Sequence, residues 1–364
     1  MLGTNGIVLI MDNELLEAIS EDNKLLQRRR EMQNKQLHIV TDYYFRHGDQ
    51  YAKHEYLEKY VPEGVYIIWI NVSGCIRMED LDNTFRWYNL TQNYMFIDCT
   101  KEVSEIWEIR DKLRKKFKQY NINEDHVYWI SGNPKDKKYV KHHIYWEMFL
   151  TAVKEMIPDR REPYFPQRVW EKKFICYNGR NRTWRRELYD AIKNKRVYTS
   201  PKSWRSGLLL QEFNYKFICD DKEEVMNTNH LWNSLEDVNY VHEFWLVTET
   251  GNWDVEPEWG QVFLTEKTFK PILLKMGFLI AGMTGSLKKL RNLGFKTFSD
   301  YWDESYDDME DWSKRKDALV ETMKDIILDD VHVPDEILEY NYNLLKEHNA
   351  DQELKDTISN LTPI

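Results

Sequence analysis

Cysteine is scarce in this sequence, and long hydrophobic runs are missing from it. Four cysteines stand far apart in 364 residues and form no Cys-x-x-Cys pair: Cys75, Cys99, Cys176 and Cys219. This spacing excludes a disulfide framework and a zinc ribbon as the basis of the fold. No apolar stretch approaches the roughly 20 residues that span a bilayer. Residues 7–11 are too short for the core of a signal peptide, so we expect a cytoplasmic protein with reduced, buried thiols.

Several widespread catalytic signatures are also absent. The sequence has no GxxxxGK[S/T] phosphate loop, no GxGxxG turn, no HExxH pair and no GxSxG elbow. These absences argue against a P-loop hydrolase, a standard Rossmann dehydrogenase, a zincin protease and a typical α/β-hydrolase. His142 and His143 lack further ligands at metal-binding spacing, so we predict that they are either structural or exposed.

The sequence is rich in apolar and aromatic residues and carries a surplus of acid. Hydrophobic residues make up 42% of the chain and aromatic residues 14%, which is enough for substantial cores. The 51 lysines and arginines and the 61 aspartates and glutamates give a formal net charge of −10. A protein that coats nucleic acid non-specifically is normally basic, because counterion release drives such binding. The composition therefore predicts a globular protein and argues against a nucleic-acid coat.

Short apolar runs alternate with a helical pattern in the first half of the chain. Buried strands are predicted at residues 37–40, 65–70, 94–97 and 127–130. Apolar residues recur every three or four positions over residues 103–117, which predicts an amphipathic helix. Strand–helix–strand order favours a parallel sheet that is covered by helices.

A proline-rich stretch separates this half from a second one. Pro158, Pro163 and Pro166 lie close together among charged residues, and few helices or strands tolerate that spacing. Beyond them, apolar runs and helical patterns alternate again. Strands are predicted at 173–177, 217–219, 243–247 and 278–281, and helices at 182–195 and 265–275.

This organisation predicts two domains and a helical tail. The predicted domains span residues 1–160 and 161–335, and C-terminal helices span residues 336–364. We predict an α/β fold in which two Rossmann-like domains face each other across a cleft. Open α/β sheets bind ligands at the carboxyl ends of their strands, so the residues that follow the strands are the candidates for function.

Arginines gather at one predicted strand-to-helix turn. Arg180, Arg182, Arg185 and Arg186 follow a strand that ends at Tyr177. Guanidinium groups beside the positive end of a helix dipole suit a diphosphate. A solvated basic helix start is the alternative interpretation.

A second anion site is predicted where a helix begins near Thr265. Thr265 is a good helix cap, and Glu266 is well placed in the first turn. Capping does not explain Lys267 and Lys270, because the helix dipole opposes positive charge there unless an anion is bound.

Glu249 follows the strand predicted at residues 243–247. We expect its carboxylate to point into the cleft and to accept hydrogen bonds from hydroxyl groups of a sugar or ribose. An ordinary loop acid is the alternative interpretation.

The second half of the chain resembles the donor-binding half of α1,3-fucosyltransferases and related phage and bacterial glycosyltransferases. That family carries a Phe-Glu-Asn-Ser element, a Tyr-Ile-Thr-Glu-Lys-Leu-Phe/Tyr helix start and a Pro-Val-Val strand. Here the three elements are matched by residues 248–250, 263–269 and 277–280. Thr250 stands where the family has Asn, and Phe263 stands where it has Tyr, so the resemblance does not specify the donor sugar.

The resemblance implies a glycosyltransferase of GT-B type whose C-terminal domain holds a nucleoside-diphosphate sugar. It implies these donor-binding residues: Arg180, Arg182, Arg185, Glu249, Phe263, Thr265, Glu266 and Lys267. Departure of the nucleoside diphosphate builds negative charge, which arginine and lysine side chains would stabilise in place of a metal ion. Apart from the nucleotide sugar, which is the substrate, no cofactor is implied.

An inverting transfer also needs a general base, which we expect from the N-terminal domain. Asp49, Glu55 and Asp98 are the candidates, because each follows or neighbours a predicted strand end. The acceptor is either a modified DNA base, as kinship with phage proteins suggests, or a glycan.

Two other interpretations stay open. Asp80-Leu81-Asp82 is an Asp-x-Asp triplet, and in another glycosyltransferase architecture such a pair binds Mn²⁺ and the donor diphosphate. Alternatively, the chain is a non-catalytic module that binds a nucleotide, a glycan or a nucleic acid. Its 14 Trp, 22 Tyr and 15 Phe would then stack on sugars or bases.

Overall fold

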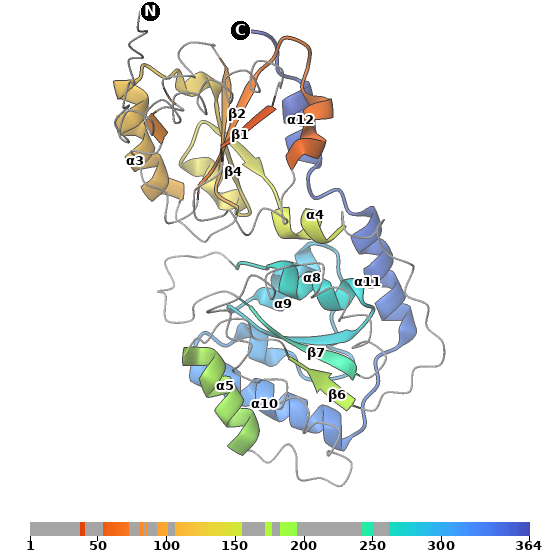
Figure 1. Cartoon of the computed structure of the whole chain (residues 1–364). Coiled ribbons are helices and arrows are strands. Elements are labelled where there is room, and N and C mark those ends of the chain that lie inside the picture. The colour runs from red at the N-terminus through yellow and green to blue at the C-terminus, as the bar shows by residue number, and fades with distance from the viewer. Residues whose placement is uncertain are drawn as a thin grey trace, which may run out of the picture.

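Two separate parallel sheets organise the chain (Figure 1). The computed structural model describes residues 37–40, 54–72, 81, 82, 85, 93–100, 106–154, 172–176, 183–194, 242–249 and 262–364. In these residues strands alternate with helices, so the predicted α/β class is confirmed.

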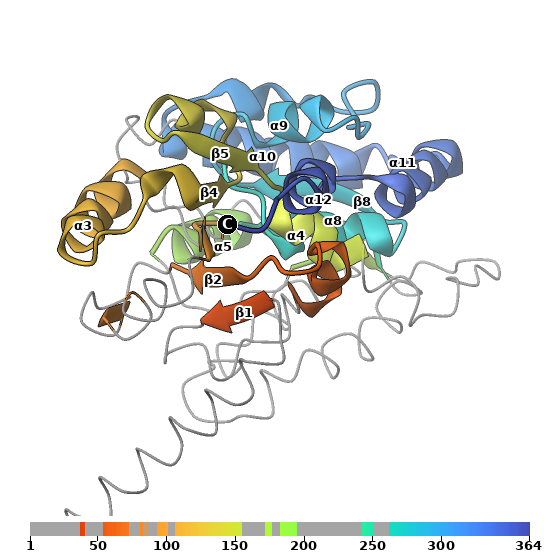
Figure 2. The same cartoon turned by 90° about the horizontal axis from the view of Figure 1, so that it is seen from above.

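The first sheet has five parallel strands in sequential order. They are β1 (Leu37–Val40), β2 (Ile67–Asn71), β3 (Tyr94–Asp98), β4 (Val127–Ser131) and β5 (His142–Tyr145). The first four confirm predicted strands, whereas β5 was not predicted. Seen from above, β1 and β5 lie at opposite edges of the sheet (Figure 2). The order does not reverse within the described strands, so they do not include the switch point of a doubly wound sheet.

Different elements cover the two faces of the first sheet. Phe117 of α3 (Ile106–Gln119) is buried on one face. Ile358 of α12 (Gln352–Ser359) packs on the other face, beside η3 (His54–Tyr60). Figure 1 shows α3 and α12 on opposite sides of the strands. The last helix of the chain therefore completes the N-terminal core.

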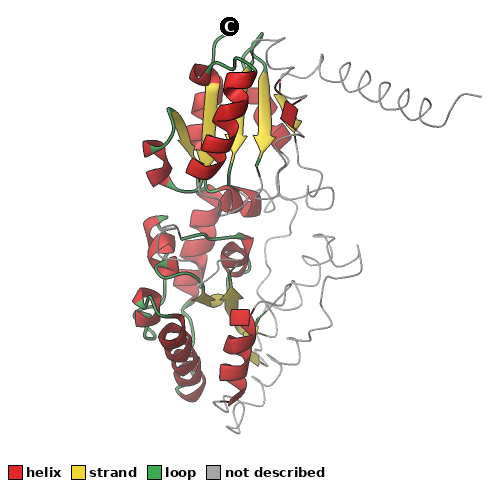
Figure 3. Ribbon diagram, turned by 90° about the vertical axis from the view of Figure 1, so that its left-hand side faces the viewer, coloured by secondary structure: helices red, strands yellow, loops and turns green. Residues whose placement is uncertain are grey.

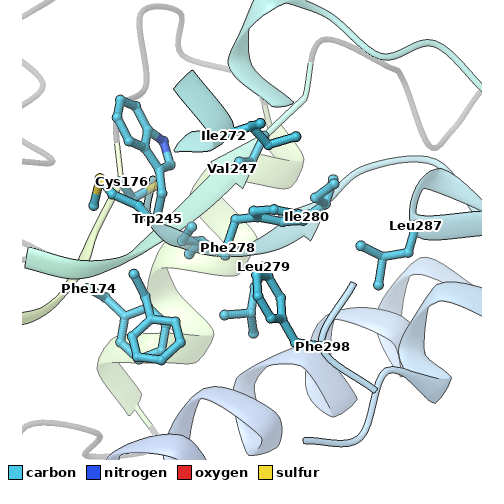
Figure 4. Packing of buried hydrophobic residues seen from close by; sticks show 14 of the residues in the cluster. Phe174, Cys176, Trp245, Val247, Ile272, Phe278, Leu279, Ile280, Leu287 and Phe298 are labelled. Atoms are coloured by element: carbon cyan, nitrogen blue, oxygen red, sulfur yellow. The ribbon is translucent and has the colours of Figure 1, made fainter. Parts of the chain in front are cut away.

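The second sheet consists of β6 (Lys172–Ile175), β7 (His242–Thr248) and β8 (Gly277–Ala281), all parallel. Its side chains form a continuous apolar core with the helices around it (Figure 4). Gly277, the first residue of β8, is closely packed. A Cβ atom at this position would lie 2.7 Å from the ring of Phe244 and 2.7 Å from the side chain of Val333, so a larger residue would not fit without a shift.

Helices surround the second sheet. They are α5 (Thr183–Asn194), α8 (Glu266–Leu273), α9 (Ser286–Asn292), α10 (Trp312–Leu328) and α11 (Asp335–Glu347). Three further 3-10 helices are short: η5 (Glu124–His126), η6 (Pro134–Lys138) and η10 (Ser305–Asp308). The predicted helices at 103–117, 182–195 and 265–275 are confirmed as α3, α5 and α8, while the strand predicted at 217–219 lies outside the described residues. No described helix has both the length and the apolar character that crossing a membrane requires.

The chain passes between the two units at α4 (Met148–Lys154) and again after α11. Leu150 and Val153 of α4 pack into the core of the second unit, although they precede the predicted boundary. The boundary at residue 160 itself lies outside the described residues. Over the predicted helical tail, residues 336–364, α11 packs on the second core and α12 on the first. Figure 3 shows the two units one above the other, each with strands at its centre.

Candidate functional site

A network of charged and hydroxyl side chains lies at the carboxyl end of β7. It joins three elements of the second unit: α5, the end of β7 and the start of α8. Its members are Arg185, Glu249, Thr265, Glu266, Lys267 and Thr268. The structure therefore brings together many of the residues predicted to bind a donor.

Glu249 is the centre of this network and is fully buried. Its Oε1 accepts hydrogen bonds from the backbone N–H of Thr265 at 2.9 Å and from Oγ1 of Thr268 at 2.5 Å. Its Oε2 accepts one from Oγ1 of Thr265 at 2.6 Å. This corrects the prediction that the carboxylate points into an open cleft to hold sugar hydroxyls. A buried carboxylate needs such partners, and here Glu249 fixes the start of α8 against the end of β7.

Arg185 holds the same strand end from the other side. It is buried, and its Nη2 donates to the backbone carbonyls of Thr248 and Glu249, each at 2.9 Å. Its guanidinium carbon lies 5.1 Å from the ring centroid of Trp184. In this structure Arg185 thus ties α5 to β7, which differs from the predicted contact with a diphosphate. Arg180 and Arg182 lie outside the described residues.

The first turn of α8 follows the predicted capping pattern. Thr265 is the N-cap, and its side chain accepts a hydrogen bond from the backbone N–H of Lys267 at 3.3 Å. The ammonium of Lys267 donates to Oγ1 of Thr265 at 3.2 Å and pairs with Oε1 of Glu266 at 3.1 Å. The Lys267 side chain is 27% exposed. The backbone N–H groups of Thr265, Lys267 and Thr268 already have partners in the protein. An anion at this site would therefore interact mainly with the charge of Lys267.

Glu266 is strongly acidic in this setting. Burial alone would raise its pKa. The charges of Lys267 and Lys270, a hydrogen bond from Lys267 and its own backbone N–H outweigh burial and lower the pKa to about 2. The carboxylate therefore stays ionised at neutral pH and keeps the lysine side chain close to the helix start.

The start of α8 also lies at the junction of the two units. The ring of Phe263 packs edge-on against Phe149 of α4, with centroids 5.5 Å apart. Lys289 of α9 pairs with Oε1 of Glu147 at 2.6 Å and donates to the carbonyl of Val262 at 3.1 Å. Sequence reasoning missed Glu147 and Lys289, because neither belongs to a recognisable motif and β5, which precedes Glu147, was not predicted.

Of the three candidate general bases, the structure describes the side chain of Asp98 alone. Asp98 is buried: its Oδ1 accepts from the backbone N–H and Oγ1 of Thr100 at 2.9 and 2.6 Å, and its Oδ2 accepts from Nε1 of Trp69 at 3.2 Å. With both oxygens engaged, Asp98 holds strand ends together, which corrects the prediction that it takes a proton from an acceptor. Glu55 lies in η3, but its side chain is not described, and Asp49 lies outside the described residues.

Asp82, from the alternative metal-binding triplet, has another partner. Its Oδ1 lies 2.6 Å from the ammonium of Lys116 on α3, while Asp80 lies outside the described residues. Within the described part of the chain, no three histidine, cysteine, aspartate or glutamate side chains are grouped so that they could hold a metal ion.

A second polar cluster lies at the end of β4. Oγ of Ser131 donates to Oδ2 of Asp136 at 2.7 Å and lies 2.9 Å from Nε2 of His143. Burial, together with the nearby charge of Lys137, lowers the pKa of His143 from 6.5 to about 4. Burial also raises the pKa of Asp136. His143 is partly buried and lies beside Ser131, which agrees with the structural one of its two predicted roles.

Comparison with known proteins adds no relative to this picture. No protein-family model matches the chain, and no match was found among curated proteins or solved structures. The interpretation of the site therefore depends on its geometry and on the short motifs of the sequence.

Proposed function

We propose that the chain is a glycosyltransferase that moves a sugar from a nucleoside-diphosphate sugar to an acceptor. The proposal also assigns the two units to the GT-B type, with two Rossmann-like domains and the donor on the second. The observation that carries it is the network at the carboxyl end of β7. There the buried Glu249 holds the start of α8, and the buried Arg185 ties α5 to the same strand end. The partly exposed Lys267 lies in the first turn of α8.

This arrangement fits the chemistry of a departing diphosphate. As the bond between the anomeric carbon and the β-phosphate oxygen breaks, its electron pair leaves with the nucleoside diphosphate. Lys267 would stabilise the charge that develops there, helped by the positive end of the α8 dipole. Arg180 and Arg182 remain proposed contacts of the same phosphates. A rigid frame favours this role, because groups that are held in place need no reorganisation during the reaction.

We propose that the reaction inverts the anomeric carbon and needs no metal ion. The cations named above would take the place of a metal, and chelation by EDTA would then leave turnover unchanged. The acceptor is a modified DNA base of a phage or a glycan. The net charge of −10 makes electrostatic attraction to DNA weaker than in a basic protein.

A thermal-shift panel of GDP-, UDP- and CDP-sugars tests the proposal. A ligand that binds only the folded state at about 100 times its Kd adds about 2.7 kcal/mol to the free energy of unfolding. We therefore expect at least one of these sugars to raise the melting temperature clearly. If no nucleotide sugar changes the melting temperature, the proposal is wrong.

The variant Lys267→Ala makes this test specific. We expect it to fold and to lose most of the shift that the best nucleotide sugar produces, because the diphosphate loses its cation. Lys324→Ala is a matched control, since Lys324 also pairs with a neighbouring glutamate, Glu321, at 3.1 Å. An equal loss in both variants would show that the shift depends on total charge and not on this site.

A further inference from the structure

Lys289 joins both units through one ammonium group. On the first unit it pairs with Oε1 of Glu147, which follows β5, and donates at 3.4 Å to the carbonyl of Gly132, which follows β4. On the second unit it donates to the carbonyl of Val262, which leads into α8. The three acceptors come from segments that are distant in sequence, so the position of this side chain fixes their relative positions.

The contact is shielded from solvent. The side chain of Lys289 is 16% exposed and that of Glu147 is 6% exposed. Tyr145 adds a third member, because its hydroxyl donates to Oε1 of Glu147 at 2.5 Å. Burial and the neighbouring Glu147 charge raise the pKa of Tyr145, so its phenol keeps the proton that it donates. Exposed ion pairs contribute little to the free energy of unfolding. A buried pair that loses one partner leaves an uncompensated buried charge, which destabilises the fold.

The segments that Lys289 joins are those on which a transfer reaction would depend. Val262 directly precedes the segment that contains Lys267, the proposed phosphate contact. Gly132 and Glu147 follow strands at the carboxyl edge of the first sheet, which is the edge where open α/β sheets bind ligands. The packing of Phe149 against Phe263 brings the same two segments together beside the ion pair.

We propose that Lys289 is a positioning residue that sets the distance between the donor-binding segment, residues 262–267, and the carboxyl edge of the first sheet. The inference rests on the proposed function in one respect, since it assigns the acceptor to that edge. A transfer requires reacting atoms about 3–3.5 Å apart, and a misplacement of about 1 Å lowers the rate on the order of 100-fold. Lys289 acts through Glu147, Gly132 and Val262 and does not touch the reacting atoms.

The test measures hydrolysis of the nucleotide sugar that raises the melting temperature most, with water as the acceptor. Lys289→Met removes the charge and keeps much of the side-chain length. We expect it to lower kcat on the order of 100-fold while KM for the nucleotide sugar stays within about twofold. Only the position of the donor-binding segment relative to the carboxyl edge of the first sheet is lost. Lys289→Arg keeps the pair with Glu147 and should recover most of the rate. Lys288→Met, at the exposed neighbouring position, is the control and should behave like the unmodified chain.

A double variant excludes simple unfolding as the cause. Lys289→Met leaves Glu147 buried without its cation, so we expect a lower melting temperature. Adding Glu147→Gln removes that charge and should restore much of the melting temperature. The rate should stay low, because the connection between the units is still missing. If the rate returns together with the melting temperature, Lys289 serves stability alone and the proposal is overturned.

Hydrogen exchange separates this inference from the proposed function. In Lys289→Met, amide exchange should become faster in both segments that the ammonium joins, residues 145–149 and 262–267. If exchange becomes faster in neither segment, or if kcat is unchanged, the positioning role is wrong. If the unmodified chain binds and hydrolyses no nucleotide sugar, the proposed function fails, and faster exchange would then support only the connection between the units.

Discussion

At the scale of single residues, most of the charged groups beside α8 hold the protein together. Glu249 receives three hydrogen bonds from Thr265 and Thr268, and Arg185 donates to two backbone carbonyls. Both side chains are buried, whereas Lys267 is 27% exposed. Lys267 is therefore the member of this network best placed to meet a ligand. Glu249 keeps the start of α8 in position, and Arg185 fixes the strand end that carries Glu249.

Glu249 is expected to stabilise the folded chain through its buried carboxylate. Glu249→Gln replaces one acceptor oxygen with an amide donor that faces a hydroxyl or N–H group. Because an unsatisfied buried polar group costs about 1–3 kcal/mol, we expect the free energy of unfolding to fall by about 2 kcal/mol in urea denaturation. Glu321→Gln on α10 is the control, since that side chain is 41% exposed. Equal effects of the two substitutions would contradict the framework role.

His143 provides a prediction about pH. Its pKa is lowered from 6.5 to about 4 in the folded protein, so between these values the unfolded chain binds the proton more strongly. The stability contributed by neutral His143 is therefore complete above pH 6.5 and is lost as the pH falls towards 4. Burial also lowers the pKa of His348, and the difference between the unmodified chain and His143→Gln isolates the part due to His143.

Urea unfolding at several pH values between 4 and 7 measures this dependence. We expect His143→Gln to show a shallower loss of stability over this range. Identical pH profiles for the two proteins would show that His143 is not held in its neutral form.

Local signals at single residues could be predicted from the sequence, and distant partners could not. The cap at Thr265 is confirmed, because the hydrogen bond that defines it reaches only two residues along the chain. The partners of Glu249 lie 16 and 19 residues away. The sequence pattern places such a carboxylate at the end of a strand, but it does not show which helix the carboxylate will contact.

At the scale of elements, buried strands and amphipathic helices were predicted well, and a polar edge strand was missed. The sequence of β5 is His-His-Ile-Tyr, with one fully buried side chain and three partly buried ones. This pattern has neither the apolar run of a central strand nor a clear alternation. The strand forms because its backbone pairs with β4 and because Ser131 lies beside His143.

The helix α12 provides the prediction at this scale. Leu354 is fully buried on the first sheet, in the same apolar cluster as Trp69 and Trp146. Leu354→Ala should lower the free energy of unfolding by about 3 kcal/mol, as is typical when a leucine is truncated in a core. Leu328→Ala on α10 is the control, since this leucine is 53% exposed and its loss should have little effect.

Urea unfolding followed by tryptophan fluorescence checks this prediction. If Leu354→Ala is no less stable than the control, α12 does not complete the N-terminal core.

At the scale of the whole molecule, the sequence does not predict which unit α4 and α12 pack against. Prolines mark a linker near residue 160 in the sequence, but α4 before it packs in the second unit and α12 at the far end returns to the first. Such crossings depend on which apolar faces fit each other, and periodicity within a segment carries no information about its partner.

The proposed glycosyltransferase would break the bond between a sugar and a nucleoside diphosphate. The most direct measurement is release of the nucleoside diphosphate from the best-binding nucleotide sugar, with EDTA present. We predict steady release by the unmodified chain and by Lys324→Ala. Release by Lys267→Ala should be at least 100-fold slower, with the fold intact, since loss of one preorganised charge contact costs on the order of 100- to 1,000-fold. Binding without turnover of any donor would contradict the proposed activity and would identify the chain as a binding module.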